Sequence, residues 1–151
     1  MRFNEKELCL YSSGPAIKEG RIHHKNPNAG FREGFKERWF KLRGNLLFYY
    51  RVNEFGGVHH KEPVGCLVIE LCRVQREDES GLGFAFSICF DSDLDKKHFL
   101  MCSNQRQCDE WVDVLSECSY QNQKNKLMDL KNQIMDITGT DPLTSYSYQT
   151  K

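Results

Sequence analysis

The sequence predicts a mainly β fold, a bent seven-stranded antiparallel sheet (a split barrel) capped by one C-terminal α-helix. Two observations predict it. Residues 36–50 hold two strand-like runs joined by a tight turn, and residues 103–118 hold an amphipathic helix that follows seven short strand patterns. A sheet with one apolar face needs a second layer, and the helix supplies it. We also expect a short N-terminal helix and a helical C-terminal extension.

The hairpin at residues 36–50 is the clearest element. Its first run, 38–42, mixes basic and apolar side chains as a half-buried strand does, and its second run, 46–50, is apolar and aromatic throughout. Gly44 and Asn45 lie between the two runs, and both tolerate the positive φ that a short hairpin loop requires. These residues therefore predict two antiparallel neighbours.

The other strands are marked by short apolar runs between polar, Gly-containing segments. Residues 26–34 and 51–62 read as loops, because they are polar and contain Gly, and the first also contains Pro. Strands are predicted at residues 17–24, 64–70, 72–76, 84–90 and 98–102.

Helices are predicted at both ends of the sheet. Asn4 and Glu7 have the spacing of a capping box, which begins a short helix within residues 1–14. Ser103 is the expected N-cap of the later helix. The apolar side chains that share one face of that helix are Cys108, Trp111, Val112, Leu115 and Cys118.

The chain divides into four predicted segments: an N-terminal helix at 1–14, a domain at 15–119, a helical extension at 120–138 and a flexible tail at 139–151. The extension carries an apolar stripe at three- and four-residue spacing, formed by Leu127, Leu130, Ile134 and Ile137. Two heptads are too short for an independent coiled coil. The stripe therefore packs back on the domain, or it pairs with a partner helix or with a second copy as a homodimer.

Charge is balanced over the whole chain but not along it. The 151 residues contain 21 basic and 21 acidic side chains. Residues 18–43 carry a net charge of +5, and residues 70–95 carry −5. This polarity predicts one basic face, whereas the zero net charge argues against a nucleic-acid partner, which usually needs a larger cationic excess.

The cysteines and the N-terminus predict a cytoplasmic protein. The seven cysteines are odd in number, form no C-x-x-C pair and mostly fall within apolar patterns, where cysteine acts as a small hydrophobe. The N-terminus lacks an apolar signal region, and no run is long enough to span a bilayer.

Enzymatic function is not expected. The sequence contains no G-x-S-x-G, Walker loop or H-E-x-x-H motif, so we predict no catalytic residue. A metal between Cys89, His98 and Cys102 is disfavoured, because strand alternation already accounts for all three. No cofactor and no metal site are predicted.

In order and spacing, the motifs resemble those of a pleckstrin homology domain over residues 17–119. The residues that carry the resemblance are Lys18-Glu19-Gly20, Arg38-Trp39-Phe40-Lys41-Leu42 and Trp111. The chain is more closely similar to the sesquipedalian group and to pleckstrin homology family J proteins. That second resemblance is carried by residues 4–8, 43–50, 62–65 and 139–143.

The resemblance implies phosphoinositide binding between the first two strands and a membrane-adaptor role in endosomal or trans-Golgi trafficking. Phosphate groups on an inositol ring need several converging cationic donors, and Arg offers paired N–H groups. Lys36 and Arg38 match the basic pair of lipid-binding members. The full set of predicted headgroup-binding residues is Lys36, Arg38, His24, Lys25, Arg32 and Arg51.

Two further expectations concern His24 and the rival ligand. His24 stands where lipid-binding members usually have Lys, so its protonation near pH 6 is predicted to strengthen binding. The alternative function is protein or peptide recognition between the fifth strand and the C-terminal helix, with weak or no lipid binding.

Overall fold

The computed structural model describes residues 4–30, 32–79 and 81–144, and the chain forms two compact units that divide between Ser119 and Tyr120. Each unit is described by itself. The strands of the first unit are β1 (Lys18–Lys25), β2 (Lys36–Arg43), β3 (Leu46–Arg51), β4 (Gly65–Val68), β5 (Cys72–Arg76), β6 (Ala85–Phe90) and β7 (Lys97–Met101). Its helices are α1 (Glu5–Ser12) and α2 (Gln105–Glu117), and the second unit contains α3 (Tyr120–Thr138).

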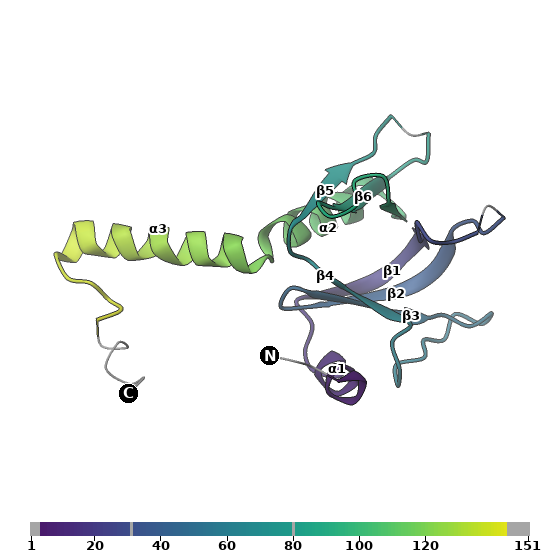
Figure 1. The fold of residues 1–151 in the computed structure, drawn as a ribbon, viewed down its shortest axis with the longest axis horizontal. Helices are drawn as coiled ribbons and strands as arrows, with labels where there is room; N and C mark the ends of the chain where they lie inside the picture. The colour runs from purple at the N-terminus through teal and green to yellow at the C-terminus, as the bar shows by residue number, and fades with distance from the viewer. Residues whose placement is uncertain (1–3, 31, 80, 145–151) are drawn as a thin grey trace. The chain divides into compact units, whose positions relative to one another are not determined.

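The seven strands form one antiparallel sheet in the order β4-β3-β2-β1-β7-β6-β5 (Figure 1). The sheet is bent but not closed, since β4 and β5 are its two edges. Strand β5 has the predicted bounds, and the other strands differ from prediction by up to two residues at either end. The predicted fold is confirmed.

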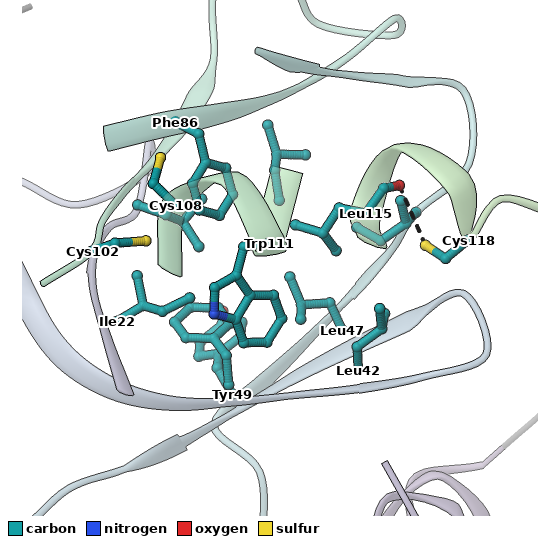
Figure 2. Close-up of a cluster of buried hydrophobic side chains, with 14 residues drawn as sticks. Ile22, Leu42, Leu47, Tyr49, Phe86, Cys102, Cys108, Trp111, Leu115 and Cys118 are labelled. Atoms are coloured by element: carbon teal, nitrogen blue, oxygen red, sulfur yellow. Dashed lines mark hydrogen bonds between the residues drawn. The ribbon is translucent and has the colours of Figure 1, made fainter. Parts of the chain in front are cut away.

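Helix α2 covers the inner face of the bent sheet. Trp111 is fully buried and lies among side chains from β1, β3 and β6, such as Ile22, Leu47 and Phe86 (Figure 2). Leu115 and Cys118 extend the same buried face, as the helical spacing predicts. The N-cap is Asn104 rather than Ser103, and the side chain of Asn104 accepts a hydrogen bond from the amide of Gln107 at 2.8 Å.

Helix α1 packs on the opposite, outer face of the sheet, below β1–β3 in Figure 1. Asn4 and Glu7 form the predicted capping box. The Tyr11 ring contacts Phe48 with centroids 6.4 Å apart, and the Tyr50 hydroxyl donates to the carbonyl of Ser12. The helix thereby covers aromatic side chains of β3 that would otherwise face water.

The second unit is a 19-residue helix followed by a short turn. Gly139 has φ of +71° and its amide donates to the carbonyl of Met135, so it ends the helix as a left-handed cap. The predicted apolar stripe is exposed within this unit. The predicted flexible tail 139–151 lies outside the described residues from 145 onward. Within the described ranges, no helix has the length and apolar character needed to cross a membrane.

Candidate functional site

Strand register gathers basic side chains at one end of the inner face. His24 pairs with Lys36, and Arg38 pairs with Ile22 on one side and with Arg51 on the other. Directly opposite residues in an antiparallel pair point to the same face, and alternate residues along a strand do too. His24, Lys36, Arg38 and Arg51 therefore share the face on which the buried Phe40 lies.

A pocket of about 200 Å³ opens at this end, beneath the loop that joins β1 and β2. Three of the predicted site residues line it together, namely His24, Lys36 and Arg38. The remaining lining residues are Asn26, Asn28, Ala29, Glu33, Gly34, Tyr49 and Val64. The pocket is polar, is cationic on its β2 side and has a buried aromatic base.

His24 forms the base of this pocket and is only 5% exposed. Its Nε2 lies 3.0 Å from Nδ1 of His98, and the two rings stack with an interplanar angle of 12°. Burial, with smaller contributions from the neighbouring His98 and Arg38, lowers the pKa of His24 to about 4. Burial also lowers the pKa of His98.

The prediction that His24 gains a proton near pH 6 is therefore wrong. Desolvation disfavours the imidazolium, and the nearby guanidinium of Arg38 repels it. At the pH of the cytosol or of a mildly acidic compartment, His24 is neutral. In the neutral form one ring of the pair donates and the other accepts across the 3.0 Å contact with His98.

Within the described part of the chain, Lys36 and Arg38 make only weak contacts. Lys36 Nζ lies 3.5 Å from Oε2 of Glu33 in an exposed ion pair, and Arg38 Nη1 lies 3.5 Å from its neighbour's carbonyl oxygen. Such contacts contribute little and are readily exchanged. The two cations can turn toward an anion that enters the pocket, at little cost in lost hydrogen bonds.

The other three predicted site residues do not line this pocket. Lys25 follows His24, so it points to the opposite face, where it lines a depression of about 300 Å³ with Asp95 and Lys97. Arg51 lines a neighbouring depression of about 510 Å³ on the side of the loop between β3 and β4. Arg32 is exposed in the β1–β2 loop.

Seven of the ten residues that line the pocket were not predicted as site residues, among them Tyr49, Asn26 and Asn28. Tyr49 shares the face of Phe40 through strand register, which the sequence alternation already indicated. Burial raises the pKa of Tyr49, so its hydroxyl keeps its proton at neutral pH and is available to donate. Asn26 accepts from the amide of Asn28 at 2.9 Å and so shapes the loop.

The thiols of four cysteines are kept protonated by their surroundings. Burial raises the pKa of the Cys66, Cys72 and Cys118 thiols to about 11 and of Cys102 to about 12, which keeps them protonated. Across residues 4–30, 32–79 and 81–144 no cluster of three His, Cys, Asp or Glu is placed to hold a metal. The pocket itself is lined by two cationic side chains, Lys36 and Arg38, against one carboxylate, Glu33.

Comparison with known proteins places this arrangement in a family. The family model of the pleckstrin homology domain matches residues 16–120. Pleckstrin homology domain-containing family J member 1 of Xenopus tropicalis is 42% identical over 97% of this chain and 90% of its own length. The human family J member 1 is 38% identical over the same shares, and human Sesquipedalian-1 is 30% identical over 92% of this chain and 53% of its own.

Solved structures show the same fold. The C-terminal pleckstrin homology domain of pleckstrin, solved in complex with an inositol pentakisphosphate, superposes with a TM-score of 0.54 at 23% identity, over 70% of this chain and 99% of that one. Another structure of the C-terminal domain of human pleckstrin gives 0.55 at 23% identity, over 72% and 92%. The chain therefore belongs to the pleckstrin homology domain family and is similar, over nearly its whole length, to the family J members.

Proposed function

We propose that this protein is a non-enzymatic membrane adaptor that binds a phosphoinositide headgroup in the pocket between β1 and β2. The observation that carries the proposal is the convergence of Lys36 and Arg38 on one pocket wall, opposite the loop that contains Asn26 and Asn28. Two cations and several neutral donors in one pocket match the needs of a multiply phosphorylated ring.

His24 takes a different part from the one a Lys would take at this position. It is neutral and fixed by His98, so it contributes shape and one hydrogen bond rather than charge. The electrostatic attraction therefore comes mainly from Lys36 and Arg38. Lys25, Arg32 and Arg51 lie outside the pocket lining and act as surrounding positive charge for an anionic membrane.

Replacement of both Lys36 and Arg38 by alanine is expected to weaken phosphoinositide binding about a hundredfold, because two charge-assisted contacts are lost. The measurement is co-sedimentation with phosphatidylcholine vesicles that contain a panel of phosphatidylinositol phosphates. The control is Lys6→Ala/Lys41→Ala, which removes two positive charges from the same unit but none from the pocket. If both double variants lose affinity equally, the pocket is not the binding site.

Protein or peptide recognition is the second candidate function. Strand β5 is an edge of the sheet and packs beside α2, so its free side offers backbone groups to an added strand. Flat binding across the vesicle panel, together with partner capture that survives Lys36→Ala/Arg38→Ala, would favour this function over lipid binding.

The proposed place of action is the endosomal or trans-Golgi membrane, where trafficking adaptors of this type work. This assignment rests on the resemblance to the sesquipedalian group. The exposed stripe of α3 is proposed to bind a partner helix or a second copy of the chain. Its members, Leu127, Leu130, Ile134 and Ile137, are each at least 42% exposed within their unit.

A further inference from the structure

The loop between β3 and β4 displays an aromatic side chain almost entirely in solvent. Phe55 is 96% exposed, more than any other large apolar side chain that the structure describes. Its neighbours are polar or lack a side chain, since Glu54 precedes it and Gly56 and Gly57 follow it. Because the whole ring lies in water, its transfer into an apolar phase would be favourable.

The loop that carries Phe55 is rigid. It continues β3 as a small hairpin, with a bridge between Val52 and Val58 and a hydrogen bond from the amide of Asn53 to the carbonyl of Gly57 at 2.8 Å. The side chain of Asn53 accepts from the amides of Phe55 at 3.0 Å and Gly57 at 2.7 Å. Because these hydrogen bonds already hold the loop in one conformation, binding does not have to order it.

A second strand fixes the orientation of this loop. The guanidinium of Arg21 in β1 donates a hydrogen bond from Nη2 to the carbonyl of Gly56. The same guanidinium lies 3.5 Å from Glu37 of β2, so the loop is tied to the framework of the sheet. Phe55 therefore projects from a fixed point rather than folding back on the domain.

The Phe55 loop leaves the sheet at the same end as the pocket. Arg38 near the start of β2 pairs with Arg51 at the end of β3, so the β1–β2 and β3–β4 loops lie at the same end of the strands, as Figure 1 shows. The depression beside the Phe55 loop contains Arg51, His59 and Lys61, and it shares Val64 with the pocket of Lys36 and Arg38.

We propose that Phe55 inserts into the bilayer when the pocket holds its headgroup, so that the β3–β4 loop is an apolar membrane anchor beside the polar site. This inference rests on the proposed function for its orientation on the membrane. A lone aromatic on a rigid tip suits the interfacial region of a bilayer, where basic neighbours meet phosphates and the ring enters the acyl boundary. A protein partner would instead need a contiguous apolar patch around Phe55, and its neighbours Glu54, Gly56 and Gly57 provide none.

Phe55→Ala is expected to weaken binding to vesicles of phosphatidylcholine, phosphatidylserine and phosphatidylinositol phosphate about tenfold, because one buried ring is lost. Binding of soluble inositol hexakisphosphate, measured by calorimetry, should not change. The matched control is Leu10→Ala, which removes a side chain that is 73% exposed on α1, away from the pocket. Unchanged vesicle binding by Phe55→Ala would overturn the proposal.

Insertion can be tested separately from headgroup recognition. The full chain, with a C-terminal hexahistidine tag, is held on nickel-chelating vesicles whose acyl chains carry bromine, which quenches tryptophan on contact. Phe55→Trp should show quenching beyond that of the parent chain, whose two tryptophans, the buried Trp111 and the partly buried Trp39, set the background. Quenching without any phosphoinositide preference would support insertion and contradict the proposed function. Phosphoinositide binding without added quenching would overturn insertion and leave the proposed function standing.

Discussion

Replacement of Trp111 by alanine is expected to lower the free energy of unfolding by about 4 kcal/mol, close to the whole stability of a marginal domain. Trp111 is 0% exposed and joins α2 to the inner face of the sheet (Figure 2). Its removal leaves a cavity that α2 cannot close without losing its contacts with β1, β3 and β6. Urea unfolding followed by circular dichroism measures the change.

Trp111→Phe keeps the prediction testable if the alanine variant does not fold. Among the described residues, Trp111 Nε1 is buried with no hydrogen-bond partner, so the ring stabilises by packing and by the ammonium of Lys18, 5.4 Å from its centroid. Phenylalanine retains most of the packing, and a loss of about 1–2 kcal/mol is expected. The control is Trp39→Phe, at a partly buried tryptophan on the outer face of β2. Equal losses for the two phenylalanine variants would contradict the assigned role of Trp111.

Acidification from neutral pH to about pH 4 is expected to remove about 3 kcal/mol of stability through His24 alone. Burial holds the pKa of this imidazole near 4 in the folded state, against 6.5 for an unperturbed His. The unfolded chain therefore binds the proton first. The stabilisation is complete above pH 6.5 and is lost as the pH falls toward 4. Urea unfolding at several pH values in this window measures the slope.

The variant that isolates this effect is His24→Gln, which keeps a polar side chain but cannot take up a proton in this range. Its stability should fall less steeply between pH 6.5 and 4 than that of the parent chain. His23→Ala is the matched control, because His23 is exposed on the other face of β1. If the stability of the parent chain and that of His24→Gln fall equally steeply with pH, the buried His24–His98 pair is not the group that titrates.

The sheet was predictable because its cues are local. The alternation in β1 and β2 and the turn at Gly44 decide strand register without help from distant residues. The position of α1 was not predicted, although the run Leu46–Tyr50 contained the signal. A strand that is apolar on both faces requires cover on both, and α1 covers the outer one through Tyr11 and Ser12.

The candidate site was only partly predictable. Lys36 and Arg38 stand two residues apart, so strand periodicity alone puts them on one face. The same periodicity sends Lys25 to the other face once His24 points inward, so its prediction as a pocket residue conflicts with strand alternation. Burial keeps His24 neutral, with a smaller contribution from His98, which lies 74 residues away along the chain, so no local pattern contains this state.

We propose that a phosphoinositide headgroup binds in the pocket formed by Lys36, Arg38 and the β1–β2 loop. Titration of the ¹⁵N-labelled chain with inositol hexakisphosphate, followed by NMR, tests it most directly. Saturable shifts are expected at the backbone amides of residues 24–29 and 34–38, together with their loss in Lys36→Ala/Arg38→Ala. Shifts confined to β5 and α2, or to the depression around Lys25 and Lys97, would contradict it.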